Sequence, residues 1–214
     1  MSGIALVLGL LLLAAISLLA VMAANGMLLQ RRMAANYADR SRALQNADLA
    51  TAAARAWLDS RADIERQAGC QANCVLPPAI HAGGALPNNP EFESAAWWRS
   101  DAVAATAHPE SGAEQGLFAP LEGEAWWLIE ELQVEPFAEA VAGPVIAAVG
   151  YYRIFGRGSG IQAGSVAVTE SVVARPWEGS YQPAPYPPQP DSPAFCRQFD
   201  AAVPCGQLAW RQRK

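Results

Sequence analysis

Four cysteines form two close pairs, and they are the residues of this chain best suited to covalent or metal chemistry. Cys70 and Cys74 are separated by three residues, and Cys196 and Cys205 by eight. An even number of closely spaced cysteines predicts local disulfides, Cys70–Cys74 and Cys196–Cys205, in an oxidising compartment, although four cysteines permit three connectivities. A zinc site is the alternative, but these spacings differ from those of common zinc knuckles. We therefore predict disulfides and no metal.

Side chains that could support catalysis are few. The two histidines, His81 and His108, do not combine with other residues into a convincing Ser/His/Asp set. Glu130 and Glu131 are adjacent in a segment that favours a strand, so their carboxylates should point to opposite faces of a sheet and cannot act together on one substrate. The chain also has no glycine-rich phosphate loop. We predict a protein that is not an enzyme and uses no cofactor.

The overall composition limits the partners and the number of domains. The chain has 214 residues, a formal net charge of −5 and no basic block apart from residues 211–214. It is therefore a poor candidate for binding nucleic acid. Beyond the long N-terminal helix described next, about 145 residues remain, enough for one modest domain with its own core.

The first thirty residues contain no charged side chain, and residues 4–24 are predominantly apolar. Twenty-one helical residues rise about 31 Å, close to the thickness of a bilayer's hydrocarbon core, so we predict a transmembrane segment over residues 4–29. A secretory signal peptide would carry basic residues before a shorter apolar run and a cleavage site after it. Here a small residue precedes the run, which favours cleavage of a prepilin-type leader between Gly3 and Ile4. Residues 1–3 would then be a leader remnant, with basic residues expected upstream.

Helix-favouring residues continue without a proline from Met27 to about Gln67, which predicts an amphipathic continuation of the same helix over residues 30–68. One side of it has a seven-residue repeat of Tyr37, Leu44, Thr51 and Leu58. This face should pack on the chain's own globular domain, with packing on other subunits as the alternative. Asn25 and Gly26 are the expected weak point, because Gly costs about 1 kcal/mol relative to Ala in a helix.

Residues 69–175 are predicted to form an α+β domain with an antiparallel sheet of 3–4 strands covered by the amphipathic helix. A short helix is expected at 91–105. The segments rich in β-branched and aromatic residues, which favour strands, are 124–135, 148–157, 165–175 and a final candidate at 206–211.

Alternation along these strands predicts which side chains share a face. Tyr152 and Ile154 should lie on one face and Phe155 on the other, and of Trp126 and Trp127 one should be in the core and its neighbour partly exposed.

Residues 176–214 should form a C-terminal region of their own. Seven prolines occur within residues 176–193, which predicts an extended strap, laid over the sheet as a spacer or offered to a proline-binding groove. The loop closed by Cys196 and Cys205 would follow the strap.

Several segments taken together resemble the PilX family of type IV pilus minor pilins. They are residues 3–8, 28–36, 39–40, 43–45, 129–132 and 152–158. The resemblance implies a type IV pilin-like fold, cleavage by the prepilin peptidase after Gly3 and N-methylation of Ile4. It further implies partnership with other minor pilins, the major pilin and a tip adhesin. Such a subunit waits in the inner membrane and then primes and caps a pilus that serves adhesion and twitching motility.

The chain departs from the usual pilin pattern at Leu8. Counted from Ile4, this is the fifth residue of the mature chain, where pilins carry a glutamate thought to pair with the N-terminal amine of the adjacent subunit. A carboxylate inside a bilayer is costly without a partner, so its absence costs least in a subunit with no neighbour ahead of it. By analogy with the K-type pseudopilins of type II secretion, we predict a position at or near the pilus tip.

Two observations bear on orientation and on alternative functions. Arg31, Arg32, Arg40 and Arg42 follow the apolar run, which by the positive-inside rule favours a cytoplasmic body. The cysteines favour a periplasmic body, which we predict. The alternatives to a minor pilin are a K-type pseudopilin of a type II secretion system, a membrane-anchored enzyme, and a membrane-anchored or secreted binding domain.

Overall fold

The computed structural model describes residues 2–62, 79–114, 116–120, 122–139, 141–162, 164–177 and 179–213. The chain forms two compact units, residues 1–39 and residues 40–214. Helix α1 (Ser2–Asp59) supplies the first unit, and its later turns belong to the second. Cys70 and Cys74 lie outside the described residues, so their predicted pairing stays a prediction.

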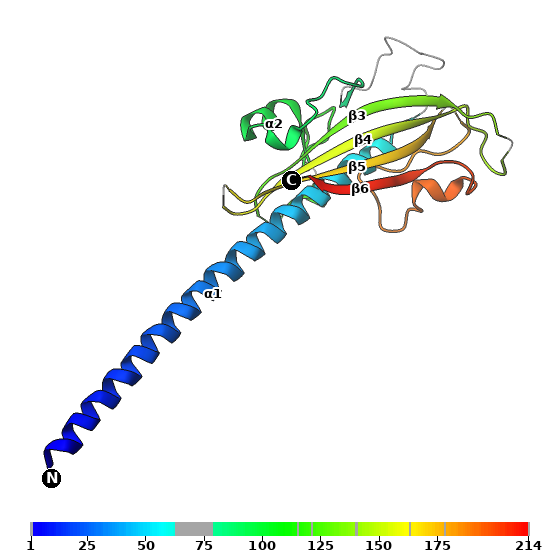
Figure 1. Cartoon of the computed structure of the whole chain (residues 1–214). Helices are drawn as coiled ribbons and strands as arrows, with labels where there is room; N and C mark the ends of the chain where they lie inside the picture. Colours follow the sequence, from blue (N-terminus) through cyan, green and yellow to red (C-terminus); the bar gives the residue numbers. More distant parts are fainter. Residues whose placement is uncertain are drawn as a thin grey trace. The chain divides into compact units, whose positions relative to one another are not determined.

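The second unit is built on a mixed sheet with the strand order β1-β3-β4-β5-β6 (Figure 1). Four antiparallel strands form most of it: β3 (Ala125–Pro136), β4 (Ala148–Ser159), β5 (Val166–Trp177) and β6 (Gly206–Arg213). Each coincides closely with a segment that the sequence marks as β-branched and aromatic. The predicted α+β fold with an antiparallel meander is confirmed.

Two short strands extend the sheet beyond the predicted meander. β1 (Ile80–His81) pairs in parallel with β3, and β2 (Val103–Ala104) pairs antiparallel with the same strand. The prediction of 3–4 strands was therefore too small. Strands of two residues are too short to show an alternating sequence pattern. They form because the edge of β3 that does not pair with β4 has free backbone N–H and C=O groups.

One face of the sheet packs on the later turns of α1, and this contact contains the largest core. Alanines of α1 allow close approach, while Trp57 and Leu58 fill the space between helix and strands. The buried sheet residues that meet the helix are Trp127, Ile129, Tyr152, Ile154, Val173 and Trp177. Packing of the amphipathic face on the chain's own domain is thus confirmed for this part of α1.

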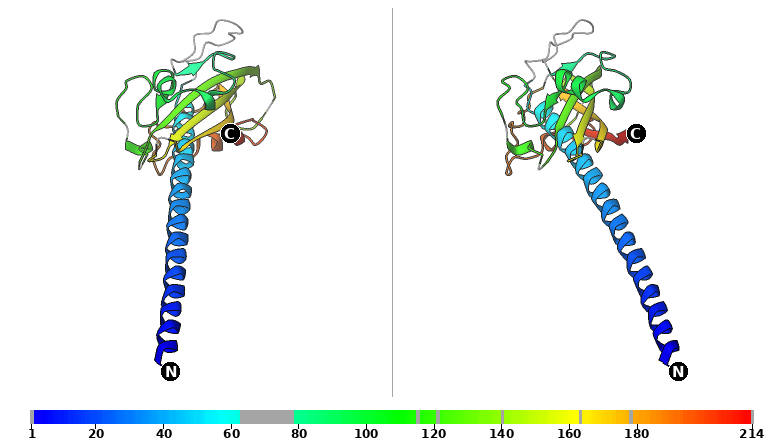
Figure 2. Two further views of the ribbon diagram at one scale, coloured as in Figure 1. Left: turned by 60° about the vertical axis from the view of Figure 1, so that its left-hand side comes forward. Right: turned by 90° about the vertical axis from the view of Figure 1, so that its left-hand side faces the viewer.

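The opposite face of the sheet is covered by the segment that contains helix α2 (Ala95–Asp101), as the views in Figure 2 show. Trp98 of this helix is fully buried against Leu128 and Phe155, and its indole nitrogen donates to the Pro90 carbonyl at 3.0 Å. Phe155 and Tyr152 therefore lie on opposite faces, as alternation predicts. Trp127 is buried and Trp126 only partly so, which confirms that prediction too.

The helix predicted at residues 91–105 is divided. A 3-10 turn, η2 (Pro90–Phe92), comes first, and α2 begins only after Ser94. The Ser94 hydroxyl accepts a hydrogen bond from the Trp97 amide at 3.1 Å, so it acts as an N-cap and starts a separate helix. The chain then enters β2, which ends the helix early.

Helix α1 ends at Asp59, so the predicted continuation is wrong for residues 60–62, while residues 63–68 lie outside the described part. The Ser60 amide donates to both the Ala56 and Trp57 carbonyls, and the Ser60 hydroxyl also donates to Trp57. These bonds tighten the last turn and satisfy carbonyl groups that would accept hydrogen bonds from later amides in a longer helix.

The proline-rich strap reaches the end of α1. The Ala184 amide donates to the Asp59 carbonyl at 3.1 Å, and Tyr186 packs against the core between helix and sheet. The 3-10 helix η4 (Phe195–Gln198) follows, and another, η3 (Gly116–Phe118), brings Phe118 against Tyr186. The strap is thus a spacer beside the helix rather than a cover for the sheet.

Candidate functional site

The apolar half of α1 is the candidate assembly element, described here within the first unit alone. Its large side chains from Ile4 to Met33 are all more than half exposed where the structure describes them. Among the described helices, α1 has the length and apolar composition that a membrane crossing requires. A helix with so much exposed apolar surface needs lipid or other helices around it, because exposing such a large apolar patch to water is unfavourable.

The predicted processing residues lie on this helix. Gly3 and Ile4 fall in its first turn, and Leu8 is 58 % exposed. The correspondence of Leu8 to the glutamate of other pilins stays a prediction. Asn25 and Gly26 are helical, and a methyl group added at Gly26 would meet open space. The helix therefore continues through the predicted weak point, and the weakness itself stays a prediction.

The later turns of α1 contact the sheet at two glycines. A Cβ atom at Gly156 would collide with the Ala47 carbonyl and the Thr51 hydroxyl, so only glycine permits this approach of helix and strand. Beside it, the Thr51 and Thr169 hydroxyls are hydrogen-bonded at 3.0 Å. Gly158 makes a similar close contact with the helix backbone. Backbone packing of this kind holds α1 at a defined register on β4.

Arg175 secures the end of α1, and sequence analysis did not single it out. Its side chain is fully buried, and it donates to the Leu58 carbonyl at 2.8 Å and to the Arg61 carbonyl. The guanidinium also lies 3.5 Å from the centroid of the Trp177 ring. Alternation along β5 could have found it, since Arg175 shares the helix-facing side with Val173 and Trp177.

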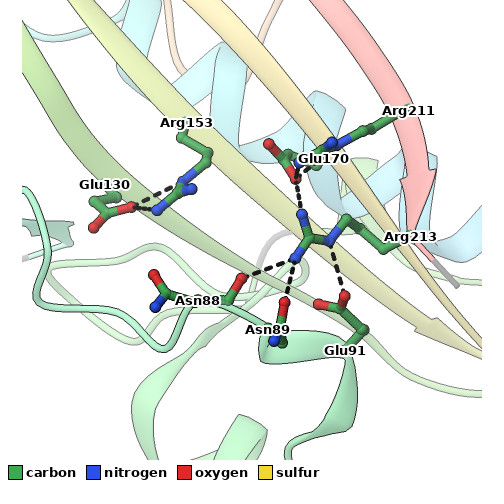
Figure 3. Close-up of polar contacts among 8 residues, drawn as sticks. All are labelled: Asn88, Asn89, Glu91, Glu130, Arg153, Glu170, Arg211 and Arg213. Atoms are coloured by element: carbon green, nitrogen blue, oxygen red, sulfur yellow. Dashed lines mark hydrogen bonds and ion pairs between the residues drawn. The ribbon is translucent and has the colours of Figure 1, made fainter.

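Ion pairs hold the C-terminal strand on the face opposite α1 (Figure 3). Glu170 accepts from Arg211 at 2.7 Å and from Arg213 at 2.8 Å. Arg213 also donates to Glu91 at 3.0 Å and to the Asn88 carbonyl at 2.8 Å. Arg211 and Arg213 are therefore part of the fold, because their charges are neutralised by Glu170 of β5 and by Glu91 before α2.

The two adjacent glutamates have structural partners on opposite faces. Glu130 is fully buried, forms an ion pair with Arg153 and accepts from the Gly84 amide at 2.7 Å (Figure 3). Glu131 accepts from the Tyr152 hydroxyl at 3.0 Å on the helix side. The predicted separation is confirmed, and neither carboxylate faces the other across a substrate site.

The C-terminal region contains a disulfide between Cys196 and Cys205, with Cα atoms 5.5 Å apart. It closes the loop between η4 and β6, as predicted for this region. Within the described ranges, no group of three or more His, Cys, Asp or Glu side chains is arranged to hold a metal ion.

These features define a class: a pilin-like α+β protein whose long N-terminal helix is apolar in its first half and packs on an antiparallel sheet with its second half. A family model described as PilX N-terminal matches residues 2–52, nearly the whole of α1. The match confirms the predicted similarity of this N-terminal segment to the PilX family of type IV pilus minor pilins. No curated protein and no solved structure matched the chain.

Proposed function

We propose that this protein is a minor pilin that primes pilus assembly and occupies a position at or near the tip, in a complex with other minor pilins. The observation that carries the proposal is Leu8, an exposed apolar side chain on a helix that matches the PilX N-terminal model. A glutamate here would need a cationic partner from a subunit ahead of it. A leucine needs none, which suits the first subunits of a fibre.

The remaining steps follow from the apolar helix. The protein waits in the inner membrane with its second unit in the periplasm, where a disulfide such as Cys196–Cys205 can form. Cleavage between Gly3 and Ile4 and N-methylation of Ile4 prepare it for extraction into the fibre. The helix then exchanges lipid for the helices of neighbouring pilins, and the tip complex meets the adhesin that supports adhesion and twitching motility.

A substitution at Leu8 tests the tip position. In a pilus-forming strain that depends on this subunit, we expect L8E to reduce pilus number strongly, because an unpaired carboxylate in the bilayer costs about 3 kcal/mol or more. The apolar control L8I should assemble normally. Pilus counts and co-purification of the other minor pilins are the measurements. Unchanged values for L8E would contradict the proposal.

The processing step has its own measurement. Mass spectrometry of the purified protein should find an N-terminus at methylated Ile4. An N-terminus near residue 24 would instead identify a secreted domain, and an unprocessed N-terminal segment would identify a plain membrane anchor. Either result would overturn the pilin pathway proposed here.

A further inference from the structure

An elongated groove runs beside the later turns of α1 within the second unit. It encloses about 630 Å³ between the helix, the strap and strand β6. Ala52 and Asp48 form part of its helical wall, Pro188 and Phe195 its strap wall, and Trp210 its β6 wall. The volume falls in the range of sites that bind small molecules or short peptide segments.

A second hollow of about 500 Å³ adjoins this groove across the strap. The two share Ala184, Pro185, Pro193 and Phe195 as a common wall. A site made of two adjoining hollows suits an extended chain better than a compact ligand. Along α1, the groove runs from Asp48 to Asp59, about 16 Å of helix, which about five extended residues would span.

The charged side chains that line the groove favour a partner with basic side chains. Two carboxylates, Asp48 and Asp59, line it, and Arg55, the one cation among its described lining residues, lies 3.9 Å from Asp59. Arg197 lines the second hollow. Burial raises the pKa of Asp48, and it raises the pKa of Asp59 to about 6 despite Arg55 and Arg175. Asp59 is therefore poorly solvated, while Asp48 is exposed and open to an approaching cation.

The apolar part of the lining is also suited to a polypeptide. Trp210 is 46 % exposed, and its indole nitrogen donates to Asp48 at 3.2 Å, which holds the ring at the groove wall. Aromatic side chains are enriched in protein interfaces, and aromatic-lined grooves recognise extended peptides.

We propose that this groove docks an extended segment of a partner protein in which aliphatic residues alternate with basic ones. The basic side chains pair with Asp48 and Asp59, and the aliphatic side chains pack on the prolines, Phe195 and Trp210. The site lies on the second unit and does not depend on where the subunit sits in a pilus.

Binding of a defined peptide tests the site. The probe is a fluorescein-labelled peptide, acetyl-Val-Arg-Val-Thr-Pro-Val-Arg-Val-amide, and its matched control has glutamate in place of both arginines. Fluorescence anisotropy is measured with the full chain in uncharged detergent micelles and with empty micelles. We expect saturable binding of the arginine peptide. The affinity for the glutamate peptide should be weaker than that for the arginine peptide by about ten-fold or more.

Matched variants locate the binding. A52W fills the groove from the helix and D48N/D59N removes both charges, so each should weaken binding about ten-fold. A96W and D101N alter an exposed alanine and an exposed aspartate of α2, on the other face of the sheet, and should leave affinity unchanged. Circular dichroism melting verifies folding, and Q207W fills the groove from β6 if A52W unfolds.

Three results would overturn the proposal. These are equal affinity for the two peptides, equal loss of binding in A52W and A96W, and concentration-dependent dimerisation that A52W abolishes, which would identify a second copy of the chain as the occupant. Each is independent of piliation, so failure here and failure of the tip position are distinguishable.

Discussion

At the scale of single residues, two charged side chains at the end of α1 have opposite effects on stability. Ionised Asp59 destabilises the fold, and Arg175 stabilises it. Asp59 lies in the last turn, where burial raises its pKa from 3.8 to about 6 although Arg55 and Arg175 lower it. Arg175 meanwhile satisfies carbonyls at the helix end. A negative charge at a helix C-terminus also opposes the helix dipole, so ionised Asp59 weakens the fold that Arg175 strengthens.

The first prediction concerns Asp59. Because its pKa is higher in the folded state than in the unfolded state, the folded state binds more protons between pH 3.8 and about 6, and stability falls as pH rises through that window. D59N should therefore raise the free energy of unfolding at pH 7 by up to about 3 kcal/mol and have little effect near pH 4. Thermal melts of the full chain at both pH values are the measurement.

A second aspartate provides the control for this prediction. D101N makes the same change of net charge at an exposed position on α2. Its effect on the melting temperature should be small and should not depend on pH in this way. Equal stabilisation by D59N at pH 4 and pH 7 would contradict the assignment of the penalty to ionised Asp59.

At the scale of elements, α1 and β4 approach so closely that the contact depends on the absence of side chains. Ala43 and Ala47 on the helix are fully buried against the sheet, and Gly156 and Gly158 face them. At this short separation the side-chain amide of Asn46 on the helix donates to the Ser159 carbonyl of β4 at 2.8 Å. Small residues decide the spacing of these two elements.

The second prediction follows from this contact. G156A should destabilise the second unit by about 1–3 kcal/mol, because the added methyl group meets the helix backbone at Ala47 and cannot be accommodated by a rotamer change. G164A, where the same methyl group meets open space, is the matched control and should be neutral. Denaturant unfolding of the full chain compares them, and equal stabilities would show that the helix is free to shift.

At the scale of the whole molecule, the C-terminal region encloses the end of the helix. The strap bonds to Asp59 through Ala184, Phe195 packs on Tyr181 and Phe199, and the Cys196–Cys205 disulfide precedes β6. β6 in turn is joined to β5 and to Glu91 by its arginines. We therefore expect the positions of β6 and of the groove wall that it forms to depend on the loop closed by the disulfide.

The third prediction tests that dependence. Replacing Cys196 and Cys205 together by alanine should lower the stability of the second unit by about 2–3 kcal/mol, since the unfolded chain is no longer constrained by the closed loop. It should also weaken binding of the arginine peptide, because Cys196 lines the groove. Reductant should lower the stability of the native chain by more than that of the variant, which keeps only the predicted Cys70–Cys74 pair. Equal effects of reductant on both would contradict this role.

The sequence by itself determined the elements, because their patterns are local. The uncharged run at residues 1–30, the alternation along β3, β4 and β5, and the spacing of Cys196 and Cys205 each express a preference of neighbouring residues. They sufficed for the α+β class, for the two faces of the sheet and for the relationship to the PilX family. The prediction that Leu8 is the position of the missing pilin glutamate likewise needs only a count of five residues along the sequence from Ile4.

The tertiary structure decided what depends on contacts between distant segments. Arg175, 116 residues beyond Asp59, bonds the Leu58 carbonyl in the last turn of α1 and the Arg61 carbonyl just after it, and no local pattern near residue 59 contains that information. The short strands β1 and β2, the glycine contact with Ala47 and the groove beside Trp210 exist for the same reason. Periodicity predicts which face of a segment is buried, whereas only packing selects the partner that buries it.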